Sequence, residues 1–214
     1  SASASAVTVL GPLFPGGMPV IAIGETSGRS FTLGQVRLVW LDHRRALTPV
    51  RQFAVLTTGS GGGQLGRALC STGDLNFDGT PDLLATSASN LFVFFLNPDG
   101  SQLRLVGQPF TGPDLAPFRT ANNDELGSAL EAAPRYGGKA HFFISAPWAS
   151  LVSPAASNHG KVFLLTVDWH GNLEGGQLLR RFSSVPFLRY GESLALLPEM
   201  VSGWAPGCDL AVGV

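Results

Sequence analysis

Short runs rich in Val, Leu, Ile and Phe alternate along this chain with stretches rich in Gly, Pro, Asn and Asp. The runs at residues 19–24, 36–41, 91–96 and 162–167 have the length of β-strands, and the residues between them favour tight turns. No stretch keeps the period of an amphipathic helix over three turns. The pattern therefore predicts a nearly all-β fold, and the 27 glycines and 15 prolines supply its many turns.

Three sequence marks recur in the same order at a spacing of roughly 60 residues, which indicates internal repeats. The first is a glycine after a large apolar residue and before small ones, at Gly66, Gly127 and Gly191. The second is an apolar strand that ends in small residues, at 19–24, 81–86, 140–147 and 208–213. The third is a strand with a tight hairpin, at 36–47, 91–103 and 162–173. A further strand follows each hairpin, as at 50–56 and 177–182, so each repeat predicts four antiparallel strands.

Repeated units of four antiparallel strands are typical of β-propeller blades, whose sheets stack their apolar faces around an axis. The predicted blades are residues 1–59, 60–120 and 121–186, followed by a half blade at 187–214. About three and a half blades do not close a ring, since propellers have roughly four to eight. We therefore expect a piece of a longer chain, or a ring completed by another subunit. The absence of an initial Met agrees with a processed chain or a fragment.

A cluster of oxygen-bearing side chains lies between two predicted strands. Asp74, Asn76, Asp78 and Asp82 occupy positions 1, 3, 5 and 9 of one loop, and Gly79 allows the chain to turn sharply there. Calcium takes about six to eight oxygen ligands, and alternate side chains of such a loop converge on one ion. The spacing predicts a calcium site, against the alternative of a polar turn that binds nothing.

The flanking sequence separates this loop from an EF-hand. Position 12 holds Ala85 where an EF-hand has a bidentate Glu, and the segments at 65–70 and 83–87 are expected to be strands, not helices. Thr80 supplies its backbone carbonyl and Asp82 replaces the missing Glu in the predicted ligand set. The prediction is a strand-loop-strand site that holds one Ca²⁺.

The loop and the repeat together resemble the FG-GAP repeats of integrin α-subunit β-propellers. The pairs Leu65-Gly66, Leu126-Gly127 and Tyr190-Gly191 are similar to the FG element, Ser145-Ala146-Pro147 is similar to the GAP element, and residues 73–84 match the family's calcium segment. The corresponding segments 10–18, 131–139 and 198–206 lack alternating carboxylates, so one calcium site is carried over. The resemblance implies an extracellular or cell-surface propeller used in adhesion or recognition.

Charge and composition exclude some other classes. A net charge of −1 and a sequence without long basic runs offer no attraction to nucleic acid or anionic lipid. The uncharged segment 1–24 is interrupted by Pro12, Pro15 and Pro19, which argues against a membrane span. Cys70 and Cys208 are too few for a disulfide framework, and both buried thiols and a disulfide stay open.

The sequence offers little support for catalysis, and we expect that the protein is not an enzyme. Ser193 lies in a motif close to a nucleophile elbow, but the repeat aligns it with Ala68 and Ala129 in a slot for small residues. The four histidines have no metal spacing, and His43 and His170 fall at predicted hairpin tips; the others are His141 and His159. The glycine-rich stretch 59–63 lacks the Lys of a phosphate-binding loop and is expected to link two blades.

Functional surfaces are expected on two faces of the propeller. The calcium loop lies on one face in a structural role, while the long connections 111–125 and 149–160 lie on the other, where ligands are expected to bind. The chain is thus predicted to be a non-enzymatic recognition, adhesion or structural module with a protein or glycan ligand. Alternatives are a carbohydrate-binding propeller, with Trp148 and Trp169 as stacking platforms beside a buried Trp40, and a non-catalytic propeller domain of a larger secreted enzyme.

Overall fold

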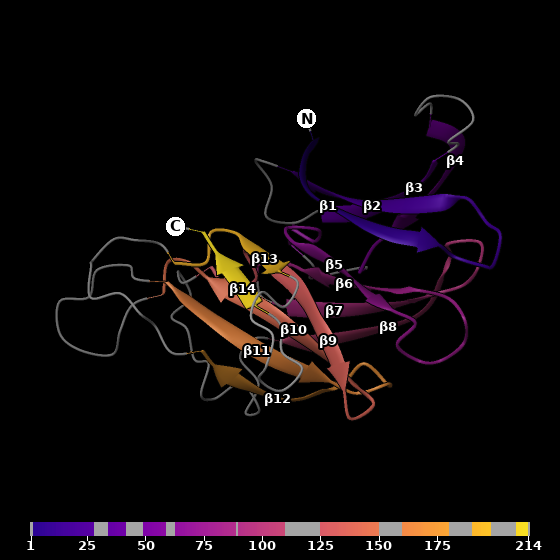
Figure 1. The fold of residues 1–214 in the computed structure, drawn as a ribbon. Helices are drawn as coiled ribbons and strands as arrows, with labels where there is room; N and C mark the ends of the chain where they lie inside the picture. The colour runs from indigo at the N-terminus through magenta and orange to yellow at the C-terminus, as the bar shows by residue number, and fades with distance from the viewer. Residues whose placement is uncertain are drawn as a thin grey trace, which may run out of the picture. The chain divides into compact units, whose positions relative to one another are not determined.

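The computed structural model describes residues 2–27, 34–41, 49–58, 63–88, 90–109, 125–149, 160–179, 190–197 and 209–213. This part of the chain contains fourteen strands and no helix, which confirms the all-β class (Figure 1). It therefore offers no helix long and apolar enough to cross a membrane. The chain divides into two compact units, one of residues 1–109 with 169–172 and the other of residues 110–168 with 173–214.

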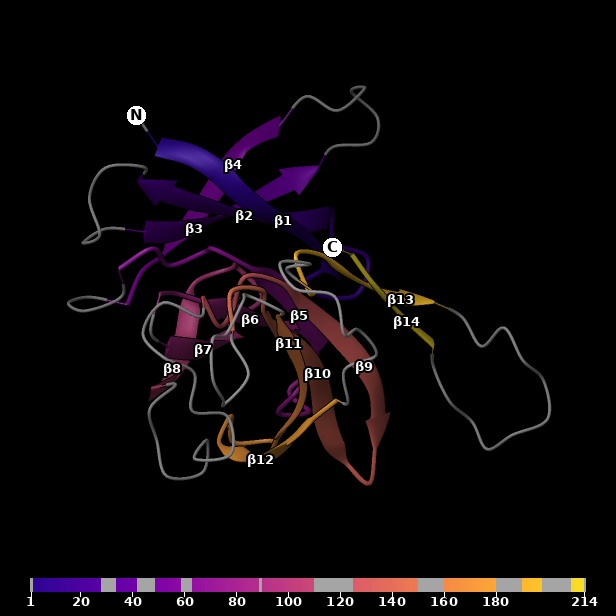
Figure 2. The same cartoon turned by 90° about the vertical axis from the view of Figure 1, so that its left-hand side faces the viewer.

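The first unit holds two four-stranded antiparallel sheets, each with its strands in sequence order (Figures 1 and 2). The first sheet consists of β1 (Ala2–Pro12), β2 (Pro19–Ser27), β3 (Gly34–Leu41) and β4 (Pro49–Leu56). The second consists of β5 (Leu69–Gly73), β6 (Asp82–Thr86), β7 (Asn90–Leu96) and β8 (Gln102–Pro109). This is the four-stranded unit that the sequence repeat predicts.

The second unit holds one four-stranded and one two-stranded antiparallel sheet. The larger sheet consists of β9 (Leu130–Tyr136), β10 (Lys139–Ala146), β11 (Lys161–Val167) and β12 (Leu173–Leu178). The smaller sheet consists of β13 (Leu194–Leu197) and β14 (Asp209–Val212). In the described part of the chain, the strands therefore divide among the sheets as the sequence predicts.

A shared hydrophobic core joins the two sheets of the first unit. Residues Val20, Ala22 and Leu38 of the first sheet belong to the same buried cluster as Leu83 and Phe94 of the second. Burial alternates along β3, so one face of that strand packs inward, whereas every residue of β6 is buried. Burying each large side chain stabilises the unit by about 1.5–3 kcal/mol.

The three glycines that recur in the sequence repeat share one backbone conformation and one hydrogen-bonding pattern. Gly66, Gly127 and Gly191 all have positive φ angles, of 87°, 89° and 100°. Each donates its N–H to a carbonyl oxygen at the end of a second strand: Gly66 to Thr86 (3.0 Å), Gly127 to Ser145 (2.8 Å) and Gly191 to Gly213 (3.0 Å). The return bonds run from Thr86, Ser145 and Gly213 to Ala68, Ala129 and Ser193. Ser193 thus takes the place of the two alanines, as the sequence alignment predicts.

One expectation about strand limits is wrong. The sequence predicts a strand from residue 65, but residues 65–68 form a turn and β5 begins at Leu69, because the positive φ angles of Gln64 (62°) and Gly66 (87°) are not compatible with extended backbone. In the segment 131–139, which lacks the alternating carboxylates of a calcium loop, β9 continues to Tyr136. A two-residue turn at Gly137 and Gly138, with φ angles of 60° and 75°, then leads directly into β10.

Several predicted features lie outside the described residues. These are most of the connections 111–125 and 149–160, most of the linker at 59–63, the segment 198–206, His43, His159 and Cys208. The expectation that ligands bind to the long connections therefore stays a prediction.

Candidate metal-binding loop

The predicted calcium loop connects β5 to β6 as a strand-loop-strand unit. Gly73 and Asp82, the residues at its two ends, are paired across the ladder. Gly79 has a φ of 89° with open space where a Cβ would lie, and Phe77 has a φ of 64° with a side chain that is 66% exposed. Ala85 lies within β6, so the loop is not an EF-hand loop.

The carboxylate of Asp74 organises the turn. Its Oδ1 accepts the N–H of Asp78 (3.0 Å) and its Oδ2 accepts the N–H of Gly79 (2.8 Å). The side-chain oxygen of Asn76 accepts the same Asp78 N–H at 3.2 Å. Two of the predicted ligand oxygens therefore converge on one backbone amide, which brings them close together.

Asn76 and Asp78 are also joined directly. The amide of Asn76 donates to Oδ2 of Asp78 at 2.8 Å, while Oδ1 of Asp78 accepts the N–H of Thr80 at 2.8 Å. Thr80 is itself buried, with 3% of its surface exposed. Residues 74–80 thus form a network of local hydrogen bonds between polar side chains and backbone amides, as in Asx turns.

Asp82 differs from the other acids because it lies in the interior. It is fully buried, with Oδ2 accepting the N–H of Leu75 (3.0 Å) and Oδ1 accepting the N–H of Leu96 (3.1 Å). Burial raises the pKa of Asp82 to about 6, and the charge of Asp78 adds to the rise, whereas the amide hydrogen bonds oppose it. Asp82 therefore ties the start of the loop to the end of β7.

The donor set agrees with the oxygen chemistry that calcium prefers. Asp74, Asn76 and Asp78 offer carboxylate and amide oxygens, and each carboxylate oxygen of Asp82 keeps acceptor capacity beside its amide bond. In the described residues, however, no three Asp, Glu, His or Cys side chains gather closely enough to hold a metal by themselves. A calcium ion would thus need the Asn76 oxygen and the Thr80 carbonyl as well as the acids.

The remaining candidate residues occupy varied positions. Trp40 is buried at 4% exposure, as predicted, and Trp169 is 52% exposed, with its ring centroid 3.4 Å from that of His170 in the β11–β12 turn. His141 is half-buried and lies within hydrogen-bond distance of Thr166 Oγ1 at 3.1 Å. Cys70 is buried in β5, and its Sγ lies 3.4 Å from the carbonyl oxygen of Ser71.

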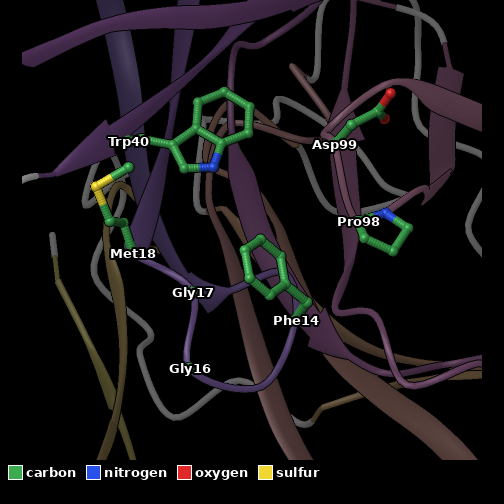
Figure 3. Close-up of a pocket in the computed structure, with 7 residues that line it drawn as sticks. All are labelled: Phe14, Gly16, Gly17, Met18, Trp40, Pro98 and Asp99. Atoms are coloured by element: carbon green, nitrogen blue, oxygen red, sulfur yellow. The ribbon is translucent and has the colours of Figure 1, made fainter.

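The first unit contains a pocket that the sequence does not predict, lined by Phe14, Met18, Trp40, Pro98 and Asp99 (Figure 3). The two signals for it were the turn sequences at 14–17 and 97–100, which contain Pro and Gly. They could not be associated from sequence, because the pocket draws on three segments far apart in the chain.

No family model matches the chain, and a search of curated proteins found no match to its sequence.

Proposed function

We propose that this chain is part of an FG-GAP-like β-propeller that acts as a non-enzymatic recognition, adhesion or structural module outside the cell. The observation that supports this proposal is a close approach between a glycine and the backbone of a later segment, which recurs in both units. In the first, a Cβ on Gly34 would lie 2.2 Å from the backbone nitrogen of Leu65; in the second, a Cβ on Gly160 would lie 2.0 Å from the carbonyl oxygen of Tyr190. Equivalent close approaches between consecutive sheets support an array of blades.

The exposed face of the first sheet supports completion of the ring by further blades or by another subunit. Val7 and Val9 alternate along β1 and are 61% and 65% exposed, in register with the half-buried Ile23 and Ile21 of β2. Apolar side chains that share one face of a sheet are typical of surfaces covered by a neighbour. In the proposed ring, this face packs against an adjoining blade.

Calcium has a structural role in this proposal. Asp74, Asn76, Asp78, Thr80 and Asp82 would hold the ion, which would neutralise the carboxylates that the turn brings together. Because the ion binds the folded loop, it stabilises the native state by mass action. Ligand recognition is assigned to other surfaces of the same domain.

The test is calcium titration combined with thermal melting. Asp74→Ala/Asp78→Ala should lose the heat of calcium binding and the chelator-dependent change in melting temperature, whereas Asp99→Ala, which removes an acid outside the loop, should keep both. Equal melting of the parent and the double variant, with and without chelator, would contradict the calcium assignment.

A carbohydrate-binding propeller is the second candidate, and the exposed indole of Trp169 is the observation in its favour. Aromatic rings provide a large contact area for sugar rings at low entropic cost. A glycan array separates the two functions. Specific binding that Trp169→Ala abolishes supports the lectin, and capture of a protein partner without glycan binding supports adhesion.

A further inference from the structure

A hollow of about 350 Å³ opens on the sheet of the second unit, over the neighbouring strands β10, β11 and β12 (Figure 1). His141, Thr166 and Gly175 are paired across these three strands, and all of them line the hollow. The other side chains around it are those of Lys139, Leu164, Glu174 and Gln177. Leu164 is the one apolar side chain among the described lining residues, so the hollow is mostly polar.

The sequence repeat explains why the sheet is hollow at this place. Thr86 of the second sheet and Ser145 of the third are equivalent, because each accepts the N–H of the glycine that recurs in the repeat. The residues paired with these two on the next strand are followed, four positions further on, by Phe95 in β7 and Thr166 in β11. Phe95 is fully buried, whereas Thr166 is half-buried. A small hydroxyl side chain therefore occupies the position that a phenyl ring fills in the second sheet.

The outermost strand of the sheet adds to the open space. In the second sheet, Arg104 pairs with Phe95 and its guanidinium carbon lies 4.1 Å from the centroid of the phenyl ring. The equivalent residue of the third sheet is Gly175, which pairs with Thr166, and a Cβ on Gly175 would have no neighbour within 4 Å. The hollow thus arises from two substitutions at equivalent positions of regular strands.

A β-bulge brings Glu174 to the hollow. The pairing of β11 with β12 shifts between Thr166 and Val167, so Glu174 is an extra residue of β12. Such a bulge changes the direction in which the side chain points. Oε2 of Glu174 lies 2.7 Å from Nζ of Lys139, which also lines the hollow. The acid and the base therefore balance each other's charge at this site.

The hydrogen bonds of His141 determine what the Thr166 hydroxyl can offer to a ligand. Nε2 of His141 lies 3.3 Å from the carbonyl oxygen of Tyr136, which can only accept, and this contact assigns the proton to Nε2. In the neutral imidazole Nδ1 is then an acceptor, so the Thr166 hydroxyl, 3.1 Å away, donates to it. The remaining lone pairs of Thr166 Oγ1 accept hydrogen bonds.

We infer that this hollow binds a neutral sugar unit of a glycan. A ligand here must donate to Thr166 and Glu174 and accept from Lys139, and hydroxyl groups do both, whereas a carboxylate cannot donate and an ammonium group cannot accept. The amide of Gln177 also donates and accepts, and Leu164 offers apolar surface to the C–H groups of a sugar ring. The inference rests on the carbohydrate-binding form of the proposed function and names a site that includes neither Trp169 nor the metal-binding loop.

NMR titration of the full chain with the methyl glycosides of glucose, galactose, mannose and N-acetylglucosamine tests the site. We expect at least one glycoside to bind with a Kd of about 1–10 mM and to shift the amide signals of Gly175 and Gly176. Thr166→Phe, which restores the ring of the second sheet, should weaken binding at least about tenfold, and Gln177→Leu at least about threefold. The matched control Gln102→Leu changes an exposed glutamine on β8, outside the hollow, and should leave binding unchanged.

Comparison with Trp169→Ala separates this site from the proposed function. Glycoside binding that Thr166→Phe abolishes and Trp169→Ala keeps supports the hollow. Binding that Trp169→Ala abolishes and both Thr166→Phe and Gln177→Leu keep overturns the inference and leaves the carbohydrate-binding function in place. If Thr166→Phe alters the melting curve, Gln177→Leu, which changes an exposed side chain, is the deciding variant. No shift of the two glycine amides by any of the glycosides up to about 100 mM would also overturn the inference.

Discussion

Gly24 and Gly66 lie so close together that a Cβ on Gly24 would be within 1.9 Å of the carbonyl oxygen of Gly66. The hydroxyl of Ser5 spans the contact, 2.8 Å from the Gly66 oxygen and 3.2 Å from the Gly24 oxygen. This contact sets the spacing between the two sheets of the first unit, because it involves backbone and leaves no flexible side chain to move aside.

Gly24→Ala should therefore destabilise the protein strongly. The added methyl group must displace backbone, and we expect a loss of about 3 kcal/mol in the free energy of unfolding, measured by urea denaturation. The matched control is Gly175→Ala, since Gly175 also lies in a strand, without a positive φ and with open space at its Cβ position. That control should be within about 1 kcal/mol of the parent. Equal effects of the two substitutions would contradict the close contact.

Asp82→Ala separates the structural role of this acid from its predicted metal role. The variant leaves the buried amides of Leu75 and Leu96 without their acceptor, and each orphaned amide costs about 1–3 kcal/mol. The loss should therefore persist in excess chelator, as measured by urea denaturation. The exposed Asp99→Ala variant should change stability little. A loss that disappears when calcium is removed would mean that Asp82 acts only through the ion.

The ion pair between Glu25 and Arg37 should make stability depend on pH. Arg37 Nε lies 2.9 Å from Oε1 of Glu25, and the hydrogen bonds from Arg37 and then Gln35 lower the pKa of Glu25. Because the folded pKa is depressed, the folded state binds fewer protons, so the stabilisation is present above the ordinary value of 4.5 and is lost as the pH falls below it.

Glu25→Gln should remove this part of the pH dependence. The parent and the variant should differ by about 1 kcal/mol or less near neutral pH, since the pair is partly exposed, and the difference should shrink toward acid pH. Urea denaturation between about pH 7 and pH 3 measures it. A difference that grows as the pH falls would contradict the assigned direction of the shift.

Sequence alone predicted the strands and their grouping because both depend on local signals. Runs such as 91–96 have the length and composition of strands, and turn residues such as Asp99 and Gly100 determine where the chain reverses. The same reasoning placed the polar loop of Asp74, Asn76 and Asp78 between two strands. Their hydrogen bonds link residues at most five positions apart, so the local sequence carries the information.

Long-range contacts were not predictable in this way. The buried position of the Asp82 carboxylate depends on a hydrogen bond from the backbone N–H of Leu96, fourteen residues further along. The Gly24–Gly66 contact depends on how two sheets pack. The turn at 65–68 was mistaken for a strand because its apolar residues have strand composition, whereas its conformation is set by Gln64 and Gly66 at positive φ. Packing between distant segments decided the first two of these features.

The hydroxyl of Thr86 provides a final prediction, about the turns that contain Gly66 and Gly127. Its Oγ1 accepts the N–H of Ala68 at 3.0 Å, and Ser145 Oγ accepts the N–H of Ala129 at 3.0 Å in the second unit. Thr86 is fully buried, so Thr86→Val keeps the volume but leaves the Ala68 amide without this acceptor. We expect a loss of about 1–3 kcal/mol in the free energy of unfolding.

Thr86→Ser is the matched control, because it keeps the hydroxyl and removes only a methyl group. It should cost about 1 kcal/mol, and less than the Val variant. Hydrogen exchange adds a local readout, since the Ala68 amide should exchange faster in Thr86→Val than in Thr86→Ser. If the Val variant is as stable as the parent and protects that amide equally, then the Thr86 hydroxyl does not stabilise this turn. The equivalent hydrogen bonds of Thr86 and Ser145 would then add nothing to the free energy of unfolding.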